Sequence, residues 1–256
     1  MHSPKALNAR LIKQSVKHPA IQDIHVFDTL ESSNTWALQH AKCGDACLTE
    51  QQNAGRGRRG KVWHSPQHSN LYLSLKWCFN KTPQHIGLLS LAVGVVIAEC
   101  LKKEGLQNHG LKWPNDIIWQ GKKLGGILLE TKGKPQHIVI GIGLNIAMPK
   151  SAQIDQPWAN LNDALNSKID RNTLSGRLLS SLALCLEGFQ QLDIKQFMQT
   201  WKKWDLLQNQ SVNILSANET LLGQAIGVNQ QGMLKVCLED GRQQTFLAAD
   251  VSIRNR

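Results

Sequence analysis

The sequence lacks paired cysteine motifs and an export leader. Its six cysteines, at positions 43, 47, 78, 100, 185 and 237 of 256, have neither the density of a disulfide framework nor the spacing of a zinc site. We therefore expect reduced thiols, no bound metal at the cysteines, and ordinary packing roles for Cys43 and Cys47. Basic side chains interrupt the first twenty residues, so no secretory signal is predicted and the cytoplasm is the expected compartment.

A long apolar segment is also missing. The most apolar stretch, residues 86–101, contains Gly87, Ser90, Gly94 and Glu99, and it falls short of the roughly 18 residues that a membrane span needs. It predicts a buried helix that continues to residue 103 and ends near Gly105, and it predicts no membrane partner.

Acidic residues are scarce, because 19 Asp and Glu stand against 29 Lys and Arg, for a formal net charge of +10. Such an excess favours anionic partners such as nucleotides, nucleic acid or an acidic protein. The basic residues are spread along the chain except at residues 56–61 and at Lys102 and Lys103, so a long nucleic-acid-binding stripe is not evident.

The apolar pattern predicts an α+β fold. Strands are expected at residues 24–27, 71–77, 111–113, 117–120, 124–130 and 138–146, and strict alternation makes 71–77 a half-buried strand. Gly121 and Lys122 favour a hairpin turn. Helices are expected at 6–16, from the caps Ser32 and Ser33 to about Ala41, from about 172 to 192, and at 197–204. These elements predict a mixed sheet covered by helices.

The character of the chain changes after residue 210. Short strands are expected at 212–215, 221–228, 234–238 and 245–251, with turns at 231–232 and 240–241, and together they predict a small β-barrel. We therefore expect an N-terminal segment at residues 1–20, a larger domain at 21–206 and a barrel domain at 207–256.

Residues 55–60, which read GRGRRG, form a segment that we call the glycine loop. Glycine lets backbone N–H groups approach a ligand closely, and each guanidinium offers a planar set of donors to phosphate or carboxylate. The letters also fit the dinucleotide-binding pattern GxGxxG. That pattern needs a preceding apolar strand and a following helix, whereas Gln51, Gln52 and Asn53 precede the loop and Pro66 follows it. The loop therefore predicts an anion site of another kind, or a solvated surface turn.

Four segments concentrate polar residues that a core does not need: 31–34, 52–63, 112–116 and 141–145. In the third, Lys112 lies at the end of an expected strand, and Pro114 fixes the turn that follows it. Such a lysine holds a compact positive charge at a defined place, although a solvated strand end is the alternative.

Together, GRGRRG followed by Trp63, KWPND at 112–116, KLGGILLE at 123–130 and GIGLN at 141–145 resemble the motifs of biotin protein ligases, in order and spacing. The resemblance extends over nearly all of the chain. It implies a class II synthetase-like catalytic domain of the biotin/lipoate ligase superfamily, followed by an SH3-like β-barrel. It also implies a reaction, in which ATP activates biotin to biotinyl-5′-AMP and the biotinyl group passes to one lysine of a biotin carboxyl carrier protein.

The resemblance implies roles for individual residues. Lys112 and Arg58 are the expected catalytic residues, because Lys112 would contact both the biotin carboxylate and the α-phosphate. Arg56 and Arg58 would close over the ligand, Trp63 would stack near the adenine, and Mg²⁺ would bind largely through the phosphates. The residues expected at biotin are Ser32, Ser33, Asn34, Gln52, Gly55, Arg56, Gly57, Arg58, Lys112, Gly125 and Gly126. Those expected at the nucleotide are Arg58, Arg59, Trp63, Lys112, Asn115 and Asn145.

The chain departs from the family pattern in two places. Ser33 stands where threonine is usual, which keeps the hydroxyl and loses a methyl contact worth on the order of 1 kcal/mol. Gln51, next to Gln52, stands where an aromatic residue can occur in the family, so either glutamine could contact the ureido group of biotin.

Two other functions compete with biotin ligation. A lipoate or octanoate ligase would share the fold and the acyl-adenylate chemistry. A basic nucleic-acid-binding protein would suit the net charge, but clustered aromatic residues for base stacking are lacking. Only about 30 residues precede Glu31, so we expect no winged-helix domain and no DNA partner; a homodimer is compatible with the sequence.

Overall fold

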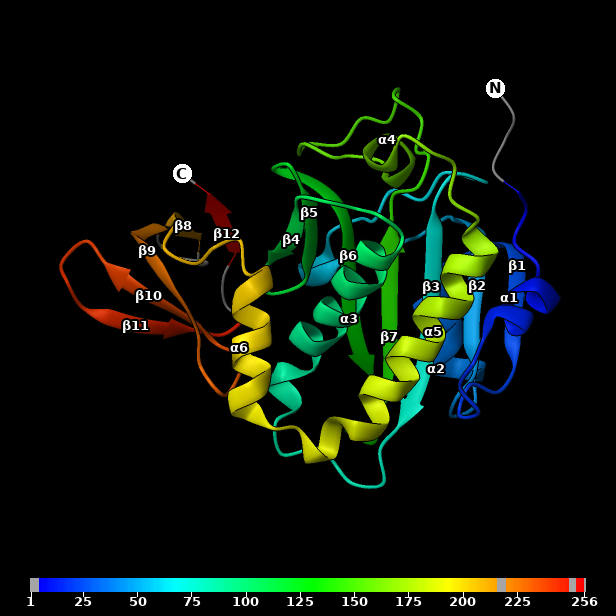
Figure 1. Ribbon diagram of the computed structural model, residues 1–256, viewed down its shortest axis with the longest axis horizontal. Helices are drawn as coiled ribbons and strands as arrows, with labels where there is room; N and C mark the ends of the chain where they lie inside the picture. Colours follow the sequence, from blue (N-terminus) through cyan, green and yellow to red (C-terminus); the bar gives the residue numbers. More distant parts are fainter. Residues whose placement is uncertain (1–4, 216–219, 249–251, 256) are drawn as a thin grey trace.

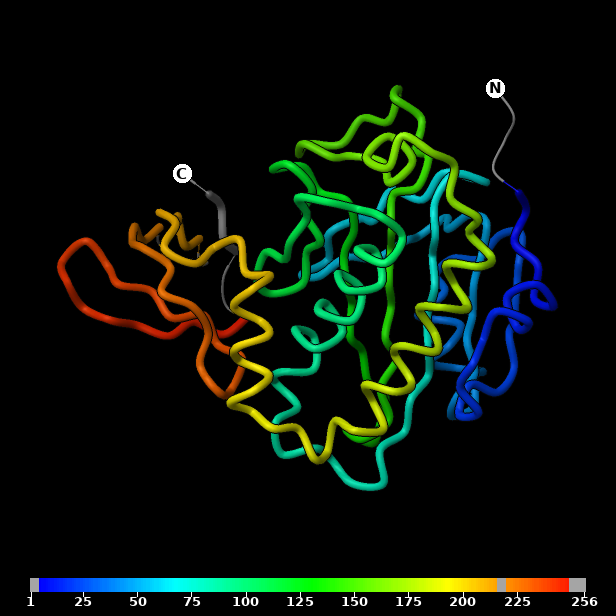
Figure 2. Tube along the Cα trace, viewed as in Figure 1, coloured from blue at the N-terminus to red at the C-terminus, as the bar shows by residue number. Residues whose placement is uncertain are grey.

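The computed structural model describes residues 5–215, 220–248 and 252–255. These residues form a seven-stranded sheet with helices on both faces and a five-stranded antiparallel sheet near the C-terminus (Figure 1). The chain trace in Figure 2 shows the N-terminal segment and the small sheet at opposite ends of the molecule.

The large sheet has the strand order β1-β2-β3-β7-β6-β5-β4. Only the pair β1 and β2 is parallel among the neighbouring strands of this sheet in the described residues, so the predicted mixed sheet is confirmed. Its strands are β1 (Ile24–Leu30), β2 (Ala46–Gln52), β3 (Leu71–Cys78), β4 (His109–Lys112), β5 (Asp116–Trp119), β6 (Lys122–Thr131) and β7 (His137–Leu144).

Helices cover the two faces of this sheet unequally. On one face α3 (Leu89–Lys103) and α5 (Arg171–Gly188) pack together, with α1 (Ala9–Ser15) against α5 and α6 (Ile194–Trp204) against α3 (Figure 1). On the other face α2 (Ser33–His40) packs on β2, β3 and β7, and the short α4 (Leu161–Leu165) follows β7 in the chain. Because strand side chains alternate, Cys47 and Val139 point under α2 and form a small core with Ala37, separate from the main core.

The helices follow their local signals. Ser32 Oγ accepts a hydrogen bond from Thr35 N over 3.4 Å, so α2 begins at its predicted cap. Helix α3 is buried along most of its length and is followed by Gly105 at φ +98°, as predicted. Every helix within the described residues is too short or too polar to span a lipid bilayer.

Two strand predictions are wrong in detail. Strand β3 is buried on both faces rather than half-buried, because it is the third of seven strands and α2 packs over Ser74. The hairpin between β5 and β6 turns at Gln120 and Gly121, both with positive φ, one residue earlier than predicted. Strand β2 was not predicted at all.

The small sheet consists of β8 (Ser211–Leu215), β9 (Thr220–Val228), β10 (Leu234–Leu238), β11 (Gln243–Phe246) and β12 (Ser252–Asn255), in the order β11-β10-β9-β8-β12. Of the predicted strand at 245–251, residues 245–246 belong to β11, residues 247–248 are not in a strand, and residues 249–251 lie outside the described part. The sheet docks on the larger unit, where Trp113 Nε1 donates to Gly232 O over 2.9 Å. The domain boundaries at residues 20 and 206 stay predictions.

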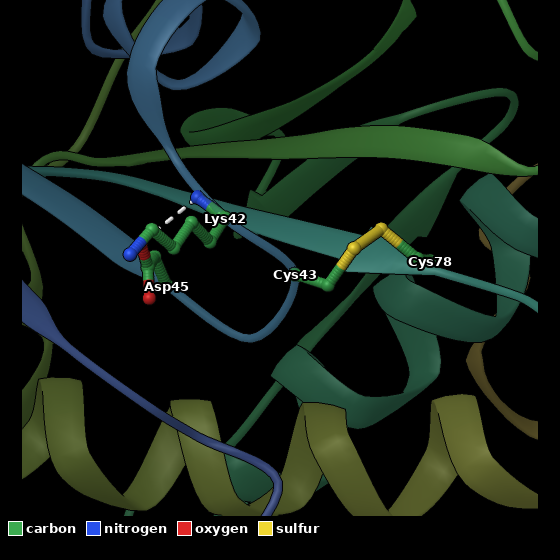
Figure 3. The surroundings of a disulfide bond; sticks show 4 residues. All are labelled: Lys42, Cys43, Asp45 and Cys78. Atoms are coloured by element: carbon green, nitrogen blue, oxygen red, sulfur yellow. Dashed lines mark hydrogen bonds between the residues drawn. A yellow bond between two sulfur atoms is a disulfide. The ribbon is translucent and has the colours of Figure 1, made fainter.

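A disulfide joins Cys43 to Cys78, with their Cα atoms 5.5 Å apart (Figure 3). Continuing the antiparallel register of β2 and β3 by three residues places these two positions opposite each other. Asp45 Oδ2 accepts from Lys42 N over 2.8 Å and shapes the turn that carries Cys43 (Figure 3). The expectation of reduced thiols is therefore wrong for this pair. The free cysteines are Cys47, Cys100, Cys185 and Cys237, and Cys47 is buried.

A buried ion pair fixes strand β2. Arg171 donates from Nη1 and Nη2 to the carboxylate of Glu50 over 2.7 and 3.1 Å, and both side chains are almost fully buried. Leu7 N donates to the same carboxylate over 2.6 Å, and His68 Nδ1 lies 3.3 Å from it. Burial alone would raise the pKa of Glu50, but the hydrogen bonds from Arg171 and Leu7, with the charges of Arg171 and His68, hold that pKa below its usual value.

Candidate active site

Gly126, Gly141 and Gly143 leave bare backbone on the sheet face that carries α2, and we call this patch the glycine floor. Gly126 in β6 pairs with Gly143 in β7, and Gly141 precedes Gly143 by two residues on the same face. A Cβ on Gly143 would lie 2.5 Å from Cε2 of Trp63, and one on Gly141 would collide with the amide of Asn34. The missing side chains therefore let Trp63 and Asn34 lie directly on the backbone of the sheet.

The first turn of α2 brings several predicted residues to this floor. Ser33 N donates to Gln52 Oε1 over 2.8 Å, and Gln52 Nε2 donates to Ser65 Oγ over 2.9 Å. Ser32, Ser33 and Asn34 are all buried. Of the two neighbouring glutamines, Gln52 is therefore the one whose amide joins the serine segment.

Two residues that the sequence did not single out hold Asn34. Ser74 Oγ donates to Asn34 Oδ1 over 2.6 Å and lies 2.8 Å from Ser33 Oγ. Asn34 Nδ2 donates to Glu130 Oε2 over 2.8 Å and to Leu128 O over 3.3 Å. Ser74 was missed because its face of β3 was expected to meet solvent, and Glu130 is the last residue of the KLGGILLE motif.

The backbone of the glycine loop folds back on itself. Gly57 N donates to Lys61 O over 2.7 Å, and Trp63 N donates to Gly55 O over 2.9 Å. Arg59 has φ +57° in a single turn of 3₁₀-helix, and the next element in the chain is strand β3. A strand does precede the loop, contrary to expectation, but no α-helix follows within this described segment, so the dinucleotide-binding pattern is excluded.

Side chains of the glycine loop reach both strand β6 and the segment that follows β11. Arg56 Nη2 lies 2.9 Å from both carboxylate oxygens of Glu130. Arg58 donates from Nη1 to Asn115 Oδ1 over 3.3 Å and from Nη2 to Ala248 O. Burial lowers the pKa of Arg58, and Arg59 lowers it further, while the charge of Asp116 partly offsets both effects.

A lysine that the sequence did not single out lies over the floor. Lys123 Nζ is 2.7 Å from Asp116 Oδ1 and 5.5 Å from the centroid of the Trp63 ring. Asn145 is buried, and its Nδ2 donates to Lys123 O over 3.2 Å, so it supports the backbone of this lysine. The sequence did offer one indication of Lys123, because it is the first residue of the KLGGILLE motif and precedes the motif's glycines by two positions.

Lys112 lies on the same face, one strand farther out. It is the cross-strand partner of Asp116, and residues 113–115 form the turn between them, with a cis peptide before Pro114. Directly opposed residues project from the same face of a sheet, and Asp116 is opposite Gly126, so Lys112 extends the row that contains the floor.

One predicted biotin residue is oriented away from the floor. A Cβ on Gly125 would point at Leu144 and Ile117 in the main core, so Gly125 borders the floor through its backbone alone. Arg58, Ser90, Pro114 and Gly232 are among the residues that line a cavity between the two sheets.

Two cations, Arg56 and Lys123, lie on the floor side of the sheet, and a third, Arg58, lies beside them on the turn between β4 and β5. Arg56 and Arg58 come from the glycine loop, and Lys123 comes from β6, with a single aromatic ring below it. Guanidinium and ammonium groups gathered in this way can hold two anionic groups side by side and lower their repulsion.

Comparison with known proteins places these features in a family. The sequence matches the biotin/lipoate A/B protein ligase family over residues 24–145 and the biotin protein ligase C terminal domain over residues 208–254. It is 37% identical over 240 residues to the bifunctional ligase/repressor BirA of Escherichia coli, covering 91% of this chain and 74% of that protein. It is 30% identical over 211 residues to the biotin–(acetyl-CoA-carboxylase) ligase of Mycobacterium tuberculosis, covering 80% and 77%.

Solved structures agree on the fold. The biotin protein ligase from Aquifex aeolicus, in complex with biotin and ATP, superposes with a TM-score of 0.80 at 23% identity, covering 92% of this chain and all of that one. The biotin protein ligase from Leishmania major with biotinyl-5-AMP gives a TM-score of 0.60 at 25% identity, covering 88% and 98%. The solved structures thus agree with the fold, and the two relatives at 37% and 30% identity, covered to 74% and 77% of their length, show that the chain belongs to the biotin protein ligase family.

Proposed function

We propose that this protein is an ATP-dependent biotin ligase that forms biotinyl-5′-AMP and transfers biotin to a lysine of a biotin carboxyl carrier protein. The observation that carries the proposal is that Arg56 and Lys123 lie at a glycine floor, with Arg58 beside it on Asn115, in a member of this family. Two anions must meet in the first step, so neutralising side chains are what the chemistry requires.

In the first step an oxygen of the biotin carboxylate attacks the α-phosphorus of ATP. The new bond is the acyl phosphate, and the bond that breaks releases pyrophosphate. In the second step the amine of the carrier lysine attacks the acyl carbon, an amide forms, and AMP and a proton leave. No nucleophile from the enzyme is needed in either step.

The biotin end of the site is proposed at the first turn of α2. The ring system of biotin is largely apolar and carries a polar ureido head, which suits a mostly apolar pocket with a few placed donors and acceptors. Ser33, Asn34 and Gln52 supply these groups, and Ser74 keeps them in place.

The nucleotide end is proposed over Trp63. An adenine ring is proposed to stack on the indole, which rests on Gly143 and Gly126, and the Lys123 ammonium over that ring would move aside to admit it. Arg58 and Asn115, which already contact each other, are proposed as hydrogen-bond donors to the phosphates. Arg59 and Asn145 are also proposed to contact the nucleotide.

Two lysines are proposed to neutralise the reacting anions. Lys112 keeps the role expected from the family resemblance, contact with the carboxylate and the α-phosphate. Lys123 is added because its ammonium already lies over Trp63 and beside Asp116. Each preorganised donor of this kind is typically worth about 10²–10³ in rate.

Magnesium is proposed to bind at the same end of the site, largely through the phosphates. The side-chain oxygens of Asn115 and Asp116 are the hard donors that Mg²⁺ prefers, and Asp116 has a second carboxylate oxygen besides the one on Lys123. Bound there and to the phosphates, Mg²⁺ would supply further positive charge.

The glycine loop is proposed to close over the intermediate. Arg56 and Arg58 anchor it at two points, to β6 and to the segment that follows β11, and a closed loop would shield the mixed anhydride from water. The proposed compartment is the cytoplasm, where the Cys43–Cys78 bond would depend on the local redox state. A homodimer remains part of the proposal.

A direct test is to incubate the purified protein with ATP, Mg²⁺ and either biotin or lipoate. Pyrophosphate release and the mass of the acyl-adenylate are measured. Biotin should give biotinyl-5′-AMP and lipoate should give no adenylate. An adenylate with lipoate alone would replace the proposal by the lipoate ligase alternative.

A further inference from the structure

One carboxylate links the glycine loop to the first turn of α2. Arg56 Nη2 lies 2.9 Å from both oxygens of Glu130, and Asn34 Nδ2 donates to Oε2 of the same group over 2.8 Å. The Glu130 side chain is 22% exposed and that of Arg56 is 45% exposed, so the ion pair lies at the rim of the site. This pair joins the glycine loop to strand β6.

Ser74, in strand β3 under α2, fixes the orientation of the Asn34 amide. Ser74 donates to Asn34 Oδ1 over 2.6 Å, and a flipped amide would lose this bond and turn its oxygen toward the Glu130 carboxylate. Two acceptors would then face each other. Glu130 is therefore held in one place by α2 and presents its charge to the loop.

Arg56 can hold Glu130 and still serve a ligand. A guanidinium has five N–H donors, and a single nitrogen, Nη2, makes both contacts to the carboxylate. The backbone bonds that fold the loop, Gly57 N to Lys61 O and Trp63 N to Gly55 O, lie on either side of Arg56. Holding Arg56 in place therefore stabilises the folded conformation of the whole loop.

We propose that Glu130 is a positioning residue that keeps the glycine loop folded over the floor by holding Arg56. Its role in the reaction rests on the proposed function, but its effect on the loop does not. When biotinyl-5′-AMP is bound, the loop opens more often without this carboxylate. The intermediate then escapes faster, while its formation at saturating substrate is little changed.

The test substitutes Glu130→Gln, which keeps the shape and an acceptor for Asn34 and removes the charge. In the ligand-free protein, hydrogen exchange of the Gly57 and Trp63 amides should become about two- to fivefold faster, the upper part of the range expected for a partly exposed charged pair. In single-turnover experiments biotinyl-5′-AMP should dissociate faster by a similar factor, with its formation rate within about twofold of the wild type.

Two comparisons make the result specific. Glu104→Gln breaks another Glu–Arg pair, with Arg177, on the opposite face of the sheet, and it should change neither measurement. In an Arg56→Gln background, Glu130→Gln should add nothing, since both act through one contact. Unchanged amide exchange in Glu130→Gln, or an undiminished effect in the Arg56→Gln background, would overturn the inference. If the wild type makes no adenylate, the proposed function fails, and amide exchange still decides the role of Glu130.

Discussion

Alanine substitutions in the glycine floor should weaken ATP binding by different amounts, because an added Cβ approaches Trp63 more closely at one glycine than at another. In Gly143→Ala the new Cβ would lie 2.5, 2.6 and 2.7 Å from three atoms of the indole. Ordinary contact begins near 3.4 Å, so the ring must move by about 0.9 Å. A misplacement of about 1 Å at a reacting site can cost up to 10²-fold in rate, and one base stacked on an aromatic ring is worth about 1–3 kcal/mol.

We therefore expect Gly143→Ala to raise the KM for ATP by about tenfold or more, with a change in the KM for biotin below about threefold. The assay is pyrophosphate release at varied ATP and at varied biotin. Gly126→Ala brings its Cβ to 3.2 Å from Trp63 and should have a smaller effect in the same direction. Gly188→Ala has no neighbouring atom within 4 Å and serves as the control. A KM for ATP within twofold of the wild type in Gly143→Ala would refute the stacking role of this floor.

Three further predictions concern charged groups. Lys112→Ala and Lys123→Ala should each slow biotinyl-5′-AMP formation by about 10²–10³-fold without unfolding the protein, and a lysine whose removal leaves the rate of pyrophosphate release unchanged has no part in the mechanism. Arg58→Gly should shorten the lifetime of the adenylate toward water, measured by the hydrolysis of biotinyl-5′-AMP in the absence of carrier; an unaltered lifetime argues against a shielding loop. Arg171→Met leaves the buried carboxylate of Glu50 without its partner and should lower the free energy of unfolding by about 3–5 kcal/mol at pH 7. The folded pKa of Glu50 is lowered, so its stabilising effect is present above the unfolded pKa of about 4.3 and is lost as the pH falls through the folded value. Denaturant titrations should show the penalty of Arg171→Met shrinking below about pH 4, and a pH-independent penalty would contradict the ion-pair explanation.

Local signals in the sequence were sufficient for much of the fold. Ser32 caps α2 and an apolar run makes α3, because both depend on residues within a few positions of each other. Three of the motifs that suggested the family also meet in the sheet, where Gly126 of KLGGILLE is opposite both Asp116 of KWPND and Gly143 of GIGLN.

Long-range partners explain what could not be predicted. Strand β2 contains Glu50 and ends in two glutamines, and it is buried only because Arg171, 121 residues away, compensates the carboxylate. Because β2 was not predicted, the register that places Cys43 opposite Cys78 could not be predicted either. Lys123 reaches Trp63 only after the β5–β6 hairpin and the glycine loop meet, so no local pattern marked it.

The most direct test of the central claim is a crystal structure with a non-hydrolysable analogue of biotinyl-5′-AMP. The claim predicts phosphoryl oxygens at hydrogen-bond distance, about 2.7–3.2 Å, from the side chains of Arg58 and Lys123, with adenine against Trp63. An analogue bound with these cations turned toward solvent, or bound away from the glycine floor, would contradict it.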